Sequence, residues 1–373
     1  MYIYLDDSIE SLDLRKSDNL KSLGYLLDAF SEGYFILSAK RKILKKLAEC
    51  SGLSIPSREA ALFAYKNYAT NQSFYNKIPF KIIITCNLTD IDNLANKWII
   101  DLSKIKPGFL SNGILILAEN LSDSTFLNFA AEHFQLKHKS ELISMKISNH
   151  FQGGGGDTIK GELKNKLDIM QEFIFCFKDS DKFSPDCEIS DNALACRNLI
   201  KQNSWLAFFA HTNCREAENL IPDKLLEKTP NIPYSQLNSL RDLSMEYNND
   251  FYSYIDIKQG LTKKFHNNLI KNSPNELFWT PVIESLKERQ IIKECEFNEK
   301  KICNVHKQLK GNNCALLEAG NEHTLDHVVN FLKTESLHKS FEIIKHDATS
   351  KEWFEIGETV FWLSCALPKI RLS

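Results

Sequence analysis

The amino-acid sequence predicts an α/β protein built around a central parallel sheet, and three observations carry this prediction. Between residues 111 and 228, strand-like apolar runs alternate with helical patterns at the spacing of βαβ units. Acidic residues stand where two of these strands would end, namely Glu119 and the pair Asp179 and Asp181. A run of glycines at 153–156 lies between them.

The first part of the chain, residues 1–107, is predicted to be a mixed α/β extension. Apolar runs at 1–5 and 80–86 indicate strands. Helical periodicity predicts helices over 19–30, 41–50 and 57–69, and a further helix over 90–102 that begins at an aspartate cap. The turn-forming segment 106–109, Lys-Pro-Gly-Phe, marks a boundary.

The central part, residues 108–230, carries the regular alternation and is predicted to be a domain with a parallel sheet. The expected strands lie at 113–119, 142–148, 172–177 and 205–211, and the expected helices at 123–134, 157–167, 191–201 and 215–226. The Pro-containing segment 228–233 ends this domain. Residues 231–373 are then mainly helical, as in 236–247 and 274–292, and finish in an apolar helix over 352–367.

Composition sets limits on function and location. The chain has 373 residues, 43% of them hydrophobic, and its formal net charge of −2 gives no basic signature, so a nucleic-acid partner would have to meet local patches. The ten cysteines form no CxxC pair, which argues against zinc ribbons and thioredoxin-like sites. No signal peptide or apolar stretch of ~18 residues is visible, and we therefore expect a cytoplasmic protein without a membrane span.

The acidic residues predict a metal site. Carboxylates at the carboxyl ends of parallel strands meet at one edge of a sheet, where α/β proteins bind ligands. Strand alternation would point Asp179 and Asp181 to the same side. Such carboxylates repel each other unless a cation lies among them, and hard oxygen ligands suit Mg²⁺ or Mn²⁺, which commonly act on phosphate esters.

Each feature also has a plainer interpretation. The Asp-Ser-Asp sequence at 179–181 is compatible with a helix cap after a strand. The glycine run is compatible with a flexible linker, although its place between strand and helix favours a turn near phosphate. The segment 215–222 is compatible with an exposed helix start whose glutamates lie near the positive end of the helix dipole.

The order of these features resembles the TOPRIM domain, which occurs in topoisomerases, primases and OLD-family nucleases. The resemblance covers residues 111–228 and rests on a glutamate after the first strand, a glycine turn and an Asp-x-Asp after a later strand. Residues 119–127, 151–159 and 215–222 are similar to motifs of OLD-like nucleases, and the sequence YSYIDIKQGL at 252–261 is also similar to that group. Asn120 departs from the usual glycine after the first glutamate.

The resemblance implies a role for each acidic and basic residue. Glu119, Asp179 and Asp181 would hold Mg²⁺, while Asp123 and Glu216 or Glu218 would hold a second ion or position water. Arg215 or Lys182 would neutralise the phosphate during attack of water on a phosphodiester.

Within that group, the chain resembles the stand-alone OLD-like TOPRIM effector of bacterial anti-phage systems such as PARIS. That resemblance implies a nuclease acting on DNA or RNA, including tRNA, as a toxic effector. No P-loop GxxxxGK[ST] is present, so an ATPase would be a separate partner protein, and self-association through the apolar helix 352–367 is a further expectation. One alternative is a TOPRIM-derived subunit that binds nucleotide or nucleic acid without cutting it. A second is a primase-like or topoisomerase-like enzyme, but the absence of a zinc ribbon and of large topoisomerase gate regions argues against it.

Overall fold

The computed structural model describes residues 1–14, 16–86, 96–202, 206–232, 237–267, 269, 273–292 and 314–371. The chain forms an α/β structure with parallel sheets flanked by helices, as the sequence predicts. It divides into two compact units that interleave along the sequence. The first unit contains Met1–Phe177, Ala195–Ala210 and Phe354–Ser373, and the second contains Lys178–Leu194 and His211–Trp353.

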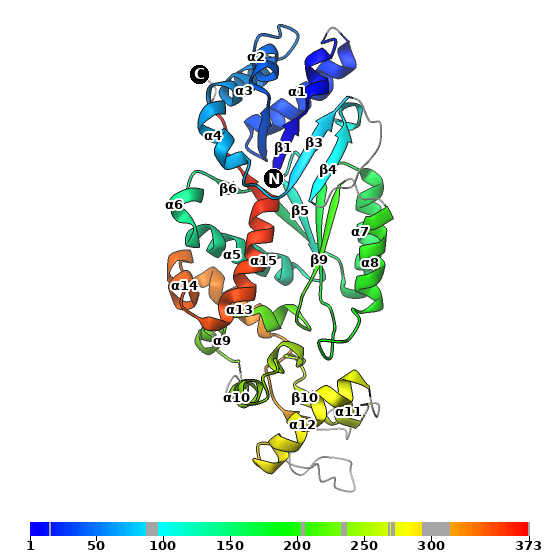
Figure 1. Ribbon diagram of the computed structural model, residues 1–373, viewed down its shortest axis with the longest axis vertical. Helices are drawn as coiled ribbons and strands as arrows, with labels where there is room; N and C mark the ends of the chain where they lie inside the picture. Colours follow the sequence, from blue (N-terminus) through cyan, green and yellow to red (C-terminus); the bar gives the residue numbers. More distant parts are fainter. Residues whose placement is uncertain are drawn as a thin grey trace. The chain divides into compact units, whose positions relative to one another are not determined.

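The N-terminal part of the first unit is a four-stranded sheet with helices packed on it (Figure 1). Its strands occur in the order β2-β1-β3-β4, and neighbouring strands run parallel. The strands are β1 (Tyr2–Leu5), β2 (Ile36–Ala39), β3 (Lys81–Thr85) and β4 (Lys97–Asp101). The helices are α1 (Ser17–Ser31), α2 (Arg41–Ala48), α3 (Ile55–Lys66) and α4 (Tyr68–Tyr75), with short 3-10 turns at Asp7–Ser11 and Leu102–Lys104.

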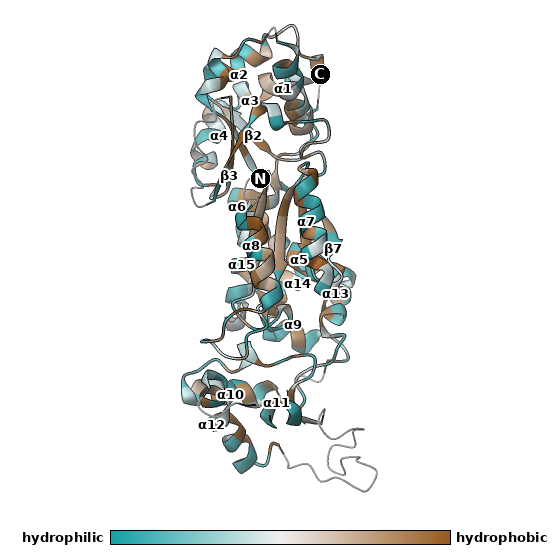
Figure 2. Ribbon diagram, turned by 90° about the vertical axis from the view of Figure 1, so that its right-hand side faces the viewer, coloured by the Kyte–Doolittle hydropathy of each residue, from teal (hydrophilic) through white to brown (hydrophobic). Residues whose placement is uncertain are grey.

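A second four-stranded sheet, in the order β7-β5-β8-β9, forms the rest of the first unit. Its strands are β5 (Ile114–Ala118), β7 (Asn149–Gly153), β8 (Phe173–Lys178) and β9 (Ala207–His211). Strand β5 runs parallel to both β7 and β8. The strands β5 and β8 are buried along their whole length, which is the pattern of a sheet covered on both faces. In Figure 2 the strands beside α7 are brown, the colour of hydrophobic residues.

Helices cover both faces of this sheet (Figure 1). On one face, α7 (Ile159–Ile169) and α8 (Asp191–Gln202) pack on the strands through a buried core that includes Leu115, Leu163 and Cys196. On the other face lies α5 (Leu121–Lys137). Helix α15 (Lys351–Ser364) packs against α5, and the ring centroids of Phe134 in α5 and Phe361 in α15 are 5.6 Å apart. Short elements complete this region: α6 (Lys139–Leu142), β6 (Lys146–Ile147), the 3-10 turn Gly156–Thr158 and β12 (Cys365–Ala366).

The second unit is mainly helical. It contains α9 (Asp223–Lys228), α10 (Leu237–Tyr247), α11 (Lys263–Asn267), α12 (Pro274–Glu288), α13 (Thr324–Thr334) and α14 (Leu337–Ile344). The short strands β10 (Leu261–Thr262) and β11 (Ala315–Leu317) pair antiparallel, and 3-10 turns lie at Ala217–Leu220, Tyr252–Tyr254 and Ala348–Ser350. Among the described residues, no helix is long and apolar enough to cross a lipid bilayer.

Four predicted elements differ from the structure. The predicted helix 90–102 contains the strand β4 instead. Buried Trp98 and Ile100 alternate there with more exposed residues, as expected for a strand. Residues 87–95 lie outside the part of the chain that the structure describes. In the predicted strand 142–148, only Lys146–Ile147 is extended, and it pairs antiparallel with β12. The second strand of the sheet is instead β7, a half-buried edge strand whose polar residues give no apolar run.

The third correction concerns the predicted helix 215–226, which is interrupted. A 3-10 turn over Ala217–Leu220 is followed by Pro222 and then by α9. The predicted helix 57–69 similarly divides near Asn67 into α3 and α4. The predicted apolar helix 352–367 is α15 followed by the short strand β12. Its residues Val360, Phe361 and Leu363 are buried, so that face is not available as an exposed apolar surface.

Candidate metal centre

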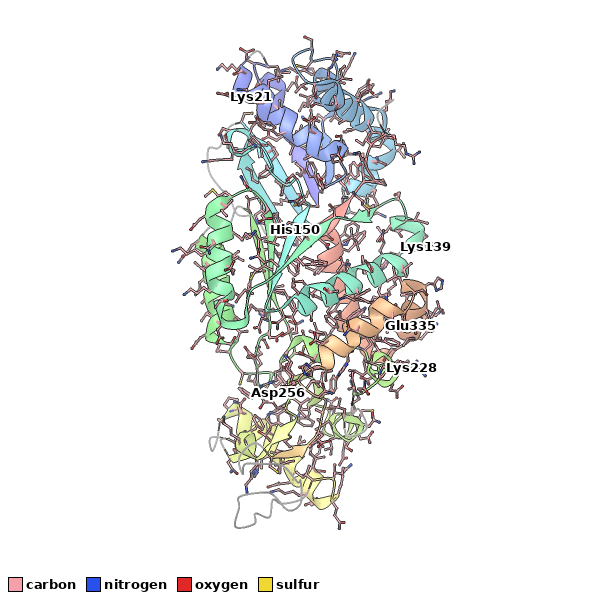
Figure 3. The ribbon with its side chains drawn as sticks, turned by 180° about the vertical axis from the view of Figure 1, so that it is seen from behind. Lys21, Lys139, His150, Lys228, Asp256 and Glu335 are labelled. Atoms are coloured by element: carbon pink, nitrogen blue, oxygen red, sulfur yellow. The ribbon has the colours of Figure 1, made fainter. Side chains whose placement is uncertain are left out.

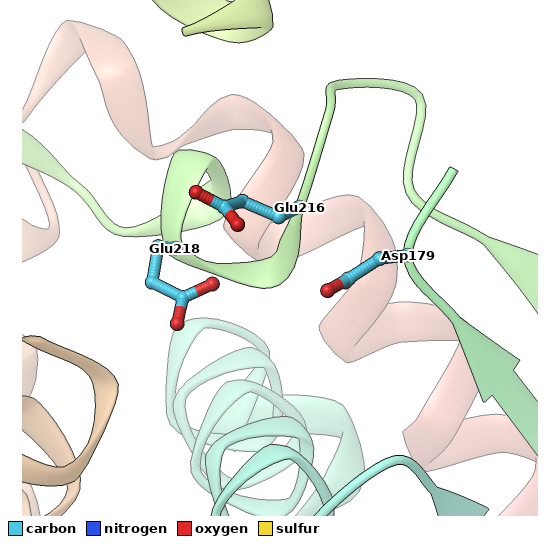
Figure 4. Close-up of side chains that lie close together, drawn as sticks. All are labelled: Asp179, Glu216 and Glu218. Atoms are coloured by element: carbon cyan, nitrogen blue, oxygen red, sulfur yellow. The ribbon is translucent and has the colours of Figure 1, made fainter. Parts of the chain in front are cut away.

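The candidate site lies in the second unit, where the backbone segment after β8 meets the segment after β9. Strand β8 is a buried apolar run that ends at Lys178, and Asp179 is the next residue (Figure 4). The backbone N–H of Ser180 donates to the hydroxyl of Thr212 at 2.9 Å, and the hydroxyl of Ser180 donates to the carbonyl of Cys214 at 2.6 Å. These bonds hold the two segments side by side.

A short turn then directs two glutamates toward Asp179. The N–H of Glu216 donates to Oδ1 of Asn219 at 3.0 Å, and the amide of Asn219 donates to the carbonyl of Tyr252 at 2.8 Å. The N–H of Ala217 donates to Oδ1 of Asp179 at 2.8 Å. The local fold therefore depends on side chains that bond to backbone, which explains why an ordinary helix does not form here.

Asp179, Glu216 and Glu218 form the acidic cluster of this site. One carboxylate oxygen from each lies within 4.8 Å of the others, and the three side chains point toward a common space (Figure 4). Glu216 is 6% exposed and Glu218 is 1% exposed. Within the described part of the chain, Oε2 of Glu218 is buried and has no hydrogen-bond partner. A buried carboxylate oxygen without a partner is costly, and a cation is the ordinary way to compensate it.

Basic and acidic side chains surround the acidic cluster. The ammonium group of Lys258 lies 3.0 Å from Oε1 of Glu218 and 3.4 Å from Oε2 of Glu216. The N–H of Ile257 donates to Oε1 of Glu216 at 2.6 Å. The guanidinium of Arg215 lies 3.2 Å from Oδ2 of Asp256, which is labelled in Figure 3.

The electrostatics of the cluster favour an added positive charge. Burial, together with the nearby carboxylates of Glu218 and Asp256, raises the pKa of Glu216 to about 8. Burial also raises the pKa of Glu218, although Lys258 opposes that effect. Burial alone would lower the pKa of Lys258, but the carboxylates of Glu218, Glu216 and Asp179 raise it overall.

The structure brings three of the predicted site residues, Asp179, Glu216 and Glu218, into one cluster, and Arg215 lies next to Glu216 in the chain. Asp181 is exposed, its φ of 57° is left-handed, and its N–H donates to the carbonyl of Arg215 at 2.9 Å. The alternation argument for Asp179 and Asp181 therefore fails, because the strand ends at Lys178. Lys182 donates from Nζ to the carbonyl of Pro185 at 3.4 Å.

Glu119 and Asp123 belong to the first unit, and their role as metal ligands stays a prediction. Asp123 is buried at the start of α5, where its Oδ2 accepts from the N–H of Asn120 at 2.8 Å as part of a capping box. The glycine turn lies beside Glu119, whose carbonyl accepts from the N–H of Gly155 at 3.1 Å. Gly155 has a φ of 69°, which a glycine adopts without strain.

Sequence reasoning missed Lys258 and Asp256 as members of the site. Both lie in the segment YSYIDIKQGL, whose similarity to a segment of OLD-like nucleases assigns no role to either residue. That segment was the one available signal, because Lys258 is 42 residues from Glu216 and no local spacing connects the two.

Comparisons of the chain with protein-family models, with curated proteins and with solved structures found no match.

Proposed function

We propose that this chain is a Mg²⁺- or Mn²⁺-dependent nuclease that hydrolyses phosphodiester bonds in DNA or RNA. The observation that carries the proposal is the acidic cluster of Asp179, Glu216 and Glu218, with its buried, unpartnered Glu218 oxygen among the described residues. The order of acidic residues and the glycine turn, which resembles that of TOPRIM nucleases, supports the same function.

The residues of the acidic cluster fit a hard divalent ion. Their donor atoms are all carboxylate oxygens, which Mg²⁺ and Mn²⁺ prefer over softer metals. If the carboxyl groups of the cluster and of Asp256 are ionised, Lys258 and Arg215 balance half of their four negative charges. A divalent ion would balance the remainder.

The basic residues around the cluster have roles in binding and orientation. A divalent ion held here would supply Lewis acidity to the phosphodiester and to the attacking water. Arg215 is oriented by Asp256, and we propose that its guanidinium contacts the phosphate oxygens. Lys182 is a second candidate for this contact, and Lys258 holds Glu216 and Glu218 in position.

One observation favours a different function, a TOPRIM-derived subunit that binds nucleic acid or nucleotide without cutting it. Lys258 already bonds to both glutamates of the cluster, as it would in a structural ion-pair network that needs no metal. In that case the cluster would fix the segment around residue 257 against the turn at Ala217–Leu220, and Glu218 would tolerate its unpartnered oxygen.

The cellular role that we propose follows from the resemblance to OLD-like TOPRIM effectors. The chain would act in the cytoplasm as the toxic component of a bacterial anti-phage system, and a separate ATPase would control it. This role would be tested by phage infection of cells that express either the parent or Glu119→Ala, each with and without the neighbouring gene products. Equal growth and equal phage yield in every arm would contradict it.

The nuclease proposal is tested with the purified chain and labelled single- and double-stranded DNA and RNA. We expect cleavage with Mg²⁺ or Mn²⁺ and none with EDTA, and we expect Asp179→Ala and Glu119→Ala to abolish it. Calorimetric titration with Mn²⁺ gives a second readout that needs no activity. Absence of Mn²⁺ binding at the cluster, together with unchanged nucleic-acid binding, would favour the non-catalytic subunit.

A further inference from the structure

A cavity lies in the second unit beside the acidic cluster. Its volume is about 350 Å³, which falls at the lower end of the range for small-molecule sites. Arg215 and Asp256 form one part of its wall, and the segment from Gln259 to Phe265 forms another. No residue of the acidic cluster lines it, so the cavity is separate from the candidate metal centre.

Aromatic rings form a flat side of the cavity. The rings of Phe183 and Phe265 stack with centroids 5.5 Å apart and an interplanar angle of 22°. Trp279 packs edge-on against Phe265 at 5.5 Å, and its indole N–H donates to the carbonyl of Phe183 at 2.6 Å, which fixes the wall. Phe183 nevertheless remains 37% exposed. An exposed aromatic ring held in place by Phe265 and the buried Trp279 is a surface on which a planar group can stack.

Cationic groups lie beside the aromatic wall. The guanidinium carbon of Arg215 lies 4.1 Å from the ring centroid of Phe183. Nε of Arg215 is buried and lacks a hydrogen-bond partner among the described residues. The exposed side chain of Lys264 also lines the cavity. A planar group bound here would therefore meet positive charge at its edge, as a nucleobase with its attached phosphate requires.

The cavity and the acidic cluster share two backbone segments. Arg215 precedes Glu216 directly, and Asp256 precedes Ile257, whose N–H bonds to Glu216. A nucleic-acid strand whose phosphate lies at the acidic cluster would place its neighbouring nucleotide against this shared wall. We propose that the cavity binds one nucleobase of a single-stranded segment of the substrate, adjacent to the phosphate at the acidic cluster; this proposal rests on the proposed nuclease function.

A single strand fits these features better than a duplex does. Stacking on aromatic side chains needs a base that has left its own stack, and such a base is present in single strands, loops and bulges. The site would accept different bases, because every base has a π-face, while the side chain of Gln259 offers an amide to a base edge.

Binding is tested in EDTA, so that cleavage does not interfere. The probe is a single-stranded oligonucleotide that carries 2-aminopurine, a fluorescent base whose emission falls when it stacks on an aromatic ring. We expect the parent chain to bind the probe and to quench it. Phe183→Ala and Phe265→Ala should each weaken binding about tenfold and remove the quenching. Tyr247→Ala is the matched control, because Tyr247 is 40% exposed in the same unit and lies outside the cavity lining.

The outcomes separate this inference from the nuclease proposal. If the parent cleaves nucleic acid but both phenylalanine variants bind the probe as the parent does, the base site is wrong and the nuclease stands. If the parent binds and quenches the probe in a phenylalanine-dependent manner but never cleaves, the base site stands and the nuclease is wrong. Failure of the parent to bind the probe overturns the base site.

A competition arm identifies the source of the base. Unlabelled oligonucleotide should displace the probe at concentrations at least a hundred times lower than those of a free nucleoside monophosphate, because the strand also contacts the cationic groups. Displacement by the mononucleotide at equal concentration would assign the cavity to free nucleotides and overturn the proposal for a strand.

Discussion

The ammonium nitrogen of Lys258 lies 3.0 Å from Oε1 of Glu218, although the two residues come from segments separated by 40 positions in the chain. This ion pair sits beside a carboxylate oxygen of the same glutamate that is buried and unpartnered among the described residues. Lys258 thus compensates only one of the two carboxylate oxygens of Glu218, and the experiments below test whether a metal ion compensates the other.

Removing the charge of Glu218 without changing its shape is the most direct test of the metal centre. Glu218→Gln should weaken Mn²⁺ binding at least tenfold and abolish metal-dependent cleavage, because an amide is a poor ligand in place of a carboxylate. Calorimetry measures the affinity, and a gel assay measures cleavage. Glu284→Gln is the control, since Glu284 is an exposed glutamate on α12 in the same unit. Equal Mn²⁺ affinity in both variants would exclude Glu218 as a ligand.

Removing Lys258 distinguishes a metal centre from an ion-pair network. Lys258→Met leaves two buried glutamates without their counter-charge, so in EDTA we expect the free energy of unfolding to fall by at most about 3 kcal/mol. Mn²⁺ should then raise the melting temperature of this variant more than that of the parent, because the ion replaces the lost cation.

Lys333→Met, at an exposed position on α13, is the control for the loss of a lysine charge. Differential scanning fluorimetry at several Mn²⁺ concentrations makes the comparison. A destabilised Lys258→Met protein that Mn²⁺ fails to rescue would support the ion-pair network instead.

The stability of the first unit should depend on pH through Glu172. The side chains of His150 and Lys166 each lie 2.8 Å from the carboxylate of Glu172 (His150 is labelled in Figure 3). The hydrogen bond from His150, together with that from Lys166, outweighs the effect of burial and lowers the pKa of Glu172 to about 2. A carboxyl group whose folded pKa lies below its unfolded value of 4.5 stabilises the fold above pH 4.5, and that stability is lost as the pH falls toward 2.

Glu172→Gln should therefore lower the free energy of unfolding by about 1–2 kcal/mol at pH 7, after allowance for the partial exposure of the group. The difference between variant and parent should shrink as the pH falls below 4.5. Urea unfolding at a series of pH values measures both quantities. A difference that stays constant from pH 7 to pH 3 would show that the ionised carboxylate is not the cause.

Two glycines in helices of the first unit should respond in opposite directions to the same substitution. At Gly357 in α15, an added Cβ would overlap the carbonyl oxygen of Ala130 in α5, so Gly357→Ala should destabilise by about 1–3 kcal/mol. At Gly161 in α7, an added Cβ would meet nothing within 4 Å, so Gly161→Ala should stabilise by up to about 1 kcal/mol. Thermal unfolding measures both, and destabilisation by both variants would disprove the contact-based argument.

The sequence predicted the central strands β5 and β8 because a strand buried on both faces is a continuous apolar run. It failed at β7, since an edge strand with polar residues such as Asn149 and Gln152 gives no such run. The prediction from sequence was also wrong at β4. Aspartates in the sequence before Lys97 are typical of a helix start, and the strand itself is short, only Lys97–Asp101.

The acidic cluster was predicted only in part for a similar reason. Asp179 follows a recognisable strand, and Glu216 and Glu218 stand in a recognisable motif. Their convergence depends on hydrogen bonds such as that from Ala217 to Asp179, and on Lys258 from a distant segment, neither of which leaves a periodic pattern. The left-handed backbone at Asp181 is likewise decided by the turn and not by strand alternation.

The contact between α5 and α15 has a consequence for biosynthesis. Helix α15 follows almost the whole second unit in sequence, whereas α5 precedes it. While the ribosome makes that intervening chain, Ala130 and Phe134 lack the partner that later covers them. The nascent protein therefore carries an uncovered apolar helix face for the time needed to translate the second unit, and such a face is prone to non-native contacts during synthesis.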